Sequence, residues 1–171
     1  MQEEDDEEKG VTEYHVRTVV KGANEAKPKK RWAALGVGDI VVDSAADESC
    51  WPKGQGDAFP TKPSKRNLVL KTANGGTMGH YGEKDIAFQN GGDIGGLKFQ
   101  VTDVTKPLLA VRRLVEKGNV VSFGPEDNQN YIHNTTSGKR VPMEKKGGSF
   151  VIRAAFVAEI ADGESGFSGR V

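Results

Sequence analysis

Asp43 and Ser44 are the residues of this chain whose types and spacing are best suited to chemistry. They follow the apolar run Ile40–Val42, which is typical of a buried strand, so we expect a carboxylate and a hydroxyl at the rim of a sheet. Ala45 and Ala46 come next, and their small side chains let a second backbone come close. Such a carboxylate can act as an acid or a base, and it can also cap a nearby amide in a turn at the end of the strand.

Acid–base hydrolysis by aspartate requires two carboxylates. One carboxylate cannot both activate a water and protonate a substrate carbonyl, whereas two close carboxylates share one proton and divide these roles. No second apolar run in the chain leads into Asp-Ser or Asp-Thr, since Asp93 follows glycines instead. A catalytic pair therefore requires Asp43 from each of two chains in a symmetric homodimer.

The length and the termini limit the class of protein. The 171 residues suit one domain with tails, and no stretch approaches the ~18 consecutive apolar residues that span a membrane. The first ten residues lack a secretory signal, so we expect an intracellular protein, cytoplasmic or nuclear and not secreted. The single cysteine, Cys50, excludes an internal disulfide and a cysteine zinc cluster, and we interpret it as a packed thiol.

The charges balance overall but are segregated along the chain. Lys and Arg number 24, as do Asp and Glu, so net charge gives no general attraction to membranes or nucleic acid. An acidic run spans Glu3–Glu8, and a basic run contains Lys27, Lys29, Lys30 and Arg31. Such blocks are usually disordered, so residues 1–31 are predicted to be a charged, largely disordered tail. The basic run leaves a nucleic-acid contact open, and Tyr14–Val20 alternates well enough to be a strand.

The remaining pattern indicates short strands. The chain has 22 glycines and only 36% hydrophobic residues, which favours an all-β domain over a helical bundle. We predict a domain over residues 32–158 and a flexible tail over 159–171. A hairpin is expected at Asn74-Gly75-Gly76, and Leu97, Phe99 and Val101 should face the core. Further strands are predicted at Asn67–Lys71, Val120–Phe123, Tyr131–His133, Arg140–Met143 and Phe150–Val157.

One helix is expected. Thr105 is a candidate cap, Pro107 suits the first turn, and Lys117-Gly118 ends the segment with a cation and a C-terminal glycine. Arg112 and Arg113 should point outward from this helix.

The segment Val41–Ala46 resembles the active-site signature of retropepsin-like aspartic proteases, in which two apolar residues precede Asp-Ser/Thr-Gly-Ala/Ser. Only Ala45 departs from it, because the family has glycine there. The order of the later elements is similar to the protease segment of copia-type retrotransposon polyproteins. Its counterparts are Asn74-Gly75, Pro107–Val111, Lys117-Gly118 and Val121–Phe123.

This resemblance implies a closed retropepsin-like β-barrel with one short helix, forming half of a homodimeric aspartic endopeptidase that processes a polyprotein. Asp43 would be the catalytic acid and base, Ser44 would hydrogen-bond at the dimer turn, and Ala45 and Ala46 would complete the loop. The partners would be a second copy and a peptide or polyprotein substrate, and no metal or organic cofactor is implied. The residues expected in a substrate-covering flap are Asn74, Gly75, Gly76 and Tyr81.

Two alternatives stay open. Ala45 costs little if its φ is negative, but a positive φ would strain the turn by ~1 kcal/mol or more. An inactive retropepsin-like module that dimerises and binds peptides is therefore the main competitor. A small β-barrel that binds nucleic acid through Lys27–Arg31 is a third interpretation, but clustered aromatics for base stacking are lacking.

Overall fold

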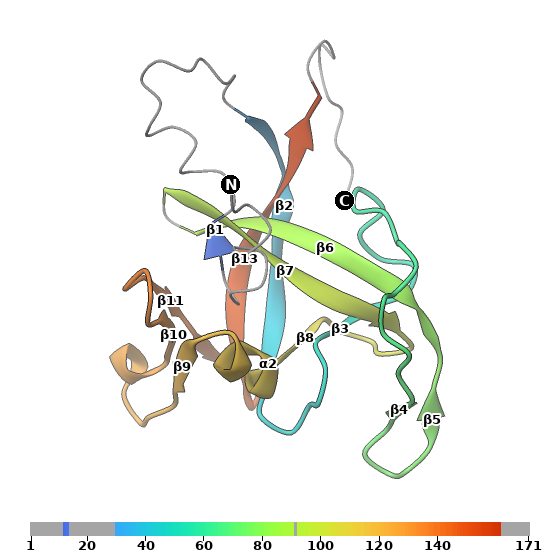
Figure 1. Ribbon diagram of the computed structural model, residues 1–171. Helices are drawn as coiled ribbons and strands as arrows, with labels where there is room; N and C mark the ends of the chain where they lie inside the picture. Colours follow the sequence, from blue (N-terminus) through green and yellow to red (C-terminus); the bar gives the residue numbers. More distant parts are fainter. Residues whose placement is uncertain (1–11, 14–29, 91, 162–171) are drawn as a thin grey trace.

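The structure is a computed structural model and describes residues 12–13, 30–90 and 92–161. These residues are mostly β-strand with one short α-helix, which confirms the all-β class (Figure 1). The acidic run, the strand expected at Tyr14–Val20, Lys27 and Lys29 of the basic run, and residues 162–171 lie outside the described residues.

The described elements follow one another in this order: β1 Thr12–Glu13, β2 Arg31–Asp43, β3 Cys50–Pro52, β4 Leu70–Lys71, β5 Thr77–Met78, β6 His80–Asn90, β7 Asp93–Thr102, β8 Leu108–Ala110, α2 Val111–Glu116, β9 Asn119–Ser122, η2 Asp127–Gln129, β10 Tyr131–Asn134, β11 Arg140–Pro142, β12 Glu144–Lys146 and β13 Ser149–Ile160.

Two long antiparallel pairs build the main sheet. β2 pairs with β13 over almost its whole length, and β6 pairs with β7 across them (Figure 1). The carboxyl end of β2 pairs in parallel with β8, and β3 joins β8 to β7. β9, β10 and β11 form a separate three-stranded sheet, and β4 pairs with β5 in a hairpin.

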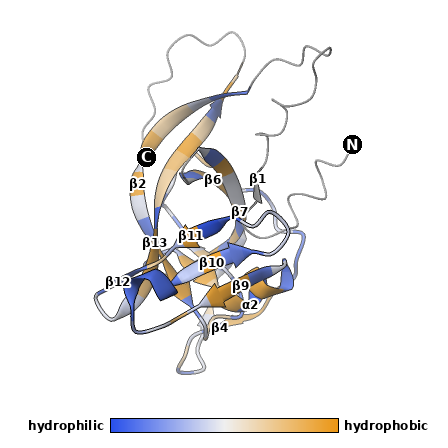
Figure 2. Ribbon diagram, turned by 90° about the vertical axis from the view of Figure 1, so that its left-hand side faces the viewer, coloured by the Kyte–Doolittle hydropathy of each residue, from blue (hydrophilic) through white to orange (hydrophobic). Residues whose placement is uncertain are grey.

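The core lies where these strands meet. Leu97, Phe99 and Val101 of β7 are all buried, as their alternation predicted. Trp51 packs edge-on against Phe99 and Phe156, with ring centroids 5.3 and 5.8 Å apart. Apolar residues extend along the twisted β2–β13 pair (Figure 2). The carboxyl end of β2 is therefore anchored on a packed interior.

The helix prediction was wrong at its start and correct at its end. Leu108–Ala110 form strand β8 rather than helix, because the carbonyl of Pro107 accepts the Val41 N–H at 3.0 Å and draws this segment into the sheet. Helix α2 therefore begins at Val111, without the cap expected from Thr105. Gly118 follows the helix with φ +88°, a conformation that favours glycine.

The Asn-Gly hairpin is confirmed. Leu70 pairs with Met78 and Lys71 with Thr77, and Gly75 has φ +90°. The side-chain carbonyl of Asn74 accepts the Gly76 N–H at 3.3 Å, which closes the turn. The strand before the turn is shorter than the predicted Asn67–Lys71.

Candidate active site

Asp43 is the last residue of β2 and lies opposite Ala110 of β8. Ile40 and Val42 are buried, so strand alternation directs the Asp43 side chain to the other face of the sheet, where it is half-buried. Its Oδ1 accepts the Ala45 N–H at 2.8 Å. No described residue hydrogen-bonds to Oδ2, so this oxygen is available to a water or a substrate.

The three residues after Asp43 form an unstrained turn. Ser44 and Ala45 are exposed and Ala46 is half-buried. Because no described residue other than glycine has a positive φ, Ala45 lies outside the left-handed region. The Ala45 methyl group therefore causes no backbone strain within one chain. The Ser44 hydroxyl makes no hydrogen bond to any described residue.

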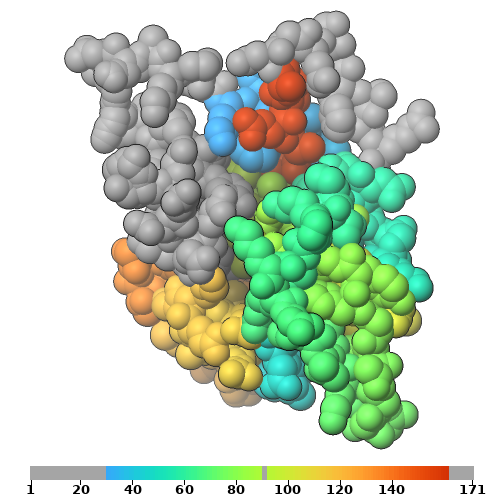
Figure 3. Space-filling model, turned by 45° about the vertical axis from the view of Figure 1, so that its right-hand side comes forward, coloured from blue at the N-terminus to red at the C-terminus, as the bar shows by residue number. Residues whose placement is uncertain are grey.

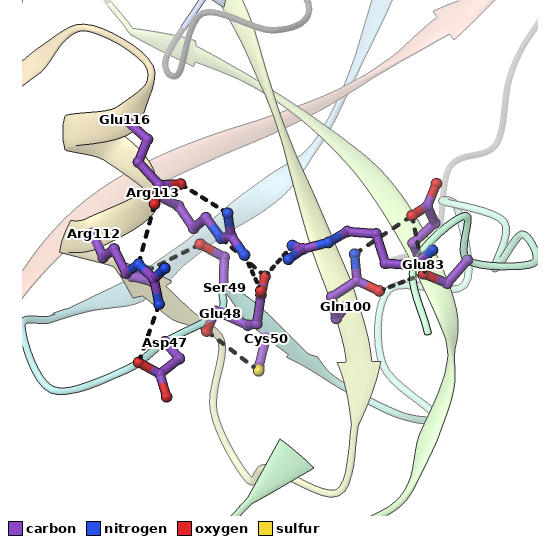
Figure 4. A network of polar contacts seen from close by, with 12 residues as sticks. Asp47, Glu48, Ser49, Cys50, Glu83, Gln100, Arg112, Arg113 and Glu116 are labelled. Carbon is purple, nitrogen blue, oxygen red and sulfur yellow. Dashed lines mark hydrogen bonds and ion pairs between the residues drawn. The ribbon is translucent and has the colours of Figure 1, made fainter. Parts of the chain in front are cut away.

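A buried ion cluster holds the next part of this segment. Glu48 is only 8% exposed, and its carboxylate contacts two arginines. Arg66 Nη1 lies 2.7 Å from Oε2, while Arg113 of α2 donates from Nε to Oε2 at 3.2 Å and from Nη2 to Oε1 (Figure 4). The hydrogen bond to Glu48 raises the pKa of Arg113. Glu48 is thus fully engaged by protein cations.

Two further contacts join this segment to the β8–α2 corner. The Ala110 N–H donates to Ser49 Oγ at 3.0 Å in a buried hydrogen bond. On the exposed side, Arg112 lies 3.6 Å from Asp47 and bonds to Glu116 (Figure 4). The turn that carries Asp43 is therefore held by the sheet at one end and by α2 at the other.

Glu83 of β6 is a second buried carboxylate, near the first. Lys98 lies 3.2 Å from it, and Gln100 donates to it at 3.4 Å. Burial by itself would raise the pKa of Glu83, but Lys98 and Gln100 lower the pKa overall. Gln100 also accepts from Ser64 and contacts His80. Glu48 and Glu83 both line a pocket of about 410 Å³.

The expected flap residues fall into two groups. Asn74, Gly75 and Gly76 are exposed at the tip of the β4–β5 hairpin. Tyr81 lies at the base, where its phenol donates to Asp103 Oδ1 at 2.8 Å and Lys53 lies over its ring. In Figures 1 and 3 the turn after β2 (cyan) and the hairpin (green) emerge at the same lower end of the molecule.

Asp103 anchors the base of the hairpin. It accepts the Gly79 N–H at 2.7 Å and the Tyr81 hydroxyl, and these two hydrogen bonds lower its pKa. The Tyr81 hydroxyl is therefore already engaged within the chain.

Sequence reasoning missed the ion cluster. Arg113 was expected on a solvated helix face, which is wrong, because it lies against Glu48 with its side chain 27% exposed. Its partner precedes it by 65 residues, so no local pattern could link them. Cys50 is buried, and burial raises its thiol pKa, which confirms the packed thiol.

The described end of the basic run belongs to the fold. Arg31 begins β2, and Lys30 lies 3.7 Å from Glu159. Within the described part of the chain, no group of His, Cys, Asp and Glu is arranged to hold a metal ion. Among those same residues, none forms a helix with the length and apolarity needed to cross a bilayer.

No protein-family model, curated protein or solved structure matches this chain.

Proposed function

We propose that this chain is a retropepsin-like aspartic endopeptidase that acts as a homodimer and processes a polyprotein of the retrotransposon type. The observation that carries the proposal is the Asp43 carboxylate at the end of β2, with one oxygen held by the Ala45 amide and Oδ2 without a bond to any described residue. A held and oriented carboxylate with a free oxygen is suited to activating a water.

The chemistry requires a second Asp43 from a partner chain. Two carboxylates placed close together cannot both ionise, so the pair holds one proton. The ionised carboxylate takes a proton from the water as it attacks the peptide carbonyl, and the protonated one donates to the carbonyl oxygen. Ser44 is exposed beside Asp43 and is available to hydrogen-bond across the two turns.

The strand pairings support a closed retropepsin-like barrel. β6 pairs with β7 along its length and with β13 at Phe88 and Gln89. Because β7 also pairs with β3, β3 with β8, β8 with β2 and β2 with β13, the pairings form a ring. The turn at Asp43 lies at one end of this ring, on a parallel strand pair followed by a short helix.

The test is cleavage of a mixed peptide library at about pH 4 to 6, where a pair sharing one proton should be competent. We expect the parent chain to cleave, pepstatin to block cleavage, and Asp43→Asn to abolish it. The side-chain amide oxygen of this variant can still accept the Ala45 N–H, so the variant should fold as the parent does. Asp127→Asn, which changes an exposed carboxylate on η2, is the matched control and should retain activity.

The proposal fails if parent and Asp43→Asn are equally inactive while sedimentation shows that the parent is a folded dimer. The exposure of Ala45 favours the second candidate, an inactive module that dimerises and binds peptides, since its methyl group would meet the partner's turn where the family has glycine. That candidate predicts peptide binding by the dimer without cleavage.

A further inference from the structure

Basic residues predominate in the lining of the pocket beside helix α2, where Lys98 and Arg113 also pair with Asp85 and Glu116 outside the lining. Five basic residues and two acidic ones line it, so it carries an excess of positive charge. Glu48 and Glu83 are the acidic residues, and both already contact basic side chains. The basic residues are Lys65, Arg66, Lys98, Arg113 and Lys117.

Of the five basic residues, Lys65 is the one best placed to contact a ligand. It is exposed at the pocket and makes no ion pair or hydrogen bond with any described residue. The pocket therefore offers a cation to a ligand that carries negative charge, beyond the cations engaged by Glu48.

Strand β1 leads towards this pocket. Thr12 pairs with Gly96 and Glu13 with Gly95, in antiparallel register on β7. Gly96, the partner of Thr12, directly precedes Leu97 and Lys98 of β7, which both line the pocket. At no more than ~3.6 Å per residue, Glu8 can lie no farther than ~14 Å from Thr12.

We propose that the cationic pocket binds the chain's own acidic run, Glu3–Glu8. The six consecutive carboxylates are opposite in charge to the basic residues that predominate in the lining, and β1, which follows the run in the sequence, pairs with β7 next to that lining. Attachment through β1 also gives the run a high effective concentration, which favours it over a free anion such as phosphate or an RNA backbone. This proposal goes beyond the protease proposal and assumes nothing about Asp43.

Zero-length carbodiimide cross-linking of the full chain tests it, because the reagent joins a carboxylate only to an amine in contact with it. We expect residues 3–8 to cross-link to Lys65 at least ~10-fold more often than to Lys71 or Lys106, two exposed lysines that do not line the pocket. The preference should disappear in about 1 M salt. Mixing isotope-labelled and unlabelled chains shows whether each cross-link lies within one chain.

Equal cross-linking to the three lysines, or cross-links that form only between chains, would overturn the proposal. A second measurement uses a variant with the six acids changed to their amides, checked for folding by circular dichroism. We expect inorganic phosphate and a short RNA to bind this variant at least ~5-fold more tightly than the parent, because the competing segment is removed. Equal binding by parent and variant would show that the run does not occupy the pocket. Neither readout depends on proteolysis.

Discussion

Asp43 and Glu48 lie in one short segment, yet their carboxylates have opposite environments. Glu48 is 8% exposed and contacts two arginines, whereas Asp43 is half-buried and accepts one backbone N–H. No described residue bonds to Asp43 Oδ2. Both oxygens of Glu48 therefore hold the segment through the two arginines, whereas Oδ2 of Asp43 is available to a ligand. The ion pairs of Glu48 thus help to position Asp43.

The largest expected loss of stability comes from removing the Glu48 carboxylate. Glu48→Ala should lower the free energy of unfolding by about 3 kcal/mol, because it leaves two arginines without their buried counterion. Asp47→Ala, at the neighbouring position, should change the free energy of unfolding by less than about 0.5 kcal/mol, since Asp47 is exposed and only weakly paired. Urea denaturation of both variants measures this difference. Equal losses would mean that the buried cluster does not hold the segment.

The two arginines of helix α2 should also differ in their contribution to stability, with the one in the buried ion pair contributing more. Arg113→Ala should cost about 2 kcal/mol, less than Glu48→Ala because Arg66 still contacts Glu48. Arg112→Ala removes only exposed pairs and should cost less than about 0.5 kcal/mol. The comparison is made on the same urea curves, and a larger loss for Arg112→Ala would contradict the assignment of the buried pair.

The two serines of the segment give a smaller contrast. Ser49→Ala leaves the buried Ala110 N–H without its acceptor and should cost about 1 to 2 kcal/mol. Ser44→Ala should leave the stability of the chain unchanged, because its hydroxyl bonds to no described residue. If Ser44→Ala lowers the melting temperature only at concentrations where the protein is a dimer, the hydroxyl acts between chains. Equal destabilisation of the monomer by Ser49→Ala and Ser44→Ala would contradict this difference between the two serines.

Placing glycine at position 45 should have the smallest effect on one chain. Ala45→Gly should lower the free energy of unfolding by about 0.4 to 1 kcal/mol, because Ala45 lies outside the left-handed region and glycine only adds freedom to the unfolded chain. The same variant should dimerise more tightly if the Ala45 methyl group meets the partner's turn. Calorimetry on a dilute sample and sedimentation at several concentrations separate the two effects.

Local signals in the sequence were sufficient for part of this arrangement. The alternation of β7, the Asn-Gly turn and the apolar run before Asp43 are patterns within a few residues, and each predicted its element. The start of α2 was missed because tertiary pairing with β2 overrode a helix signal at Pro107. The Glu48 cluster was missed because its three members come from separate segments, and only folding brings them together.

The parallel pairing of β2 with β8 has a consequence for how the chain folds. Ser49 finds its backbone partner at Ala110, 61 residues later, and Glu48 meets Arg113 at a separation of 65. Contacts of such long range form slowly, since a large loop must close before they contribute. During synthesis the Asp43 turn therefore emerges long before its support. A nascent chain that has not yet reached helix α2 cannot hold this turn in place, so the site is completed only late in folding.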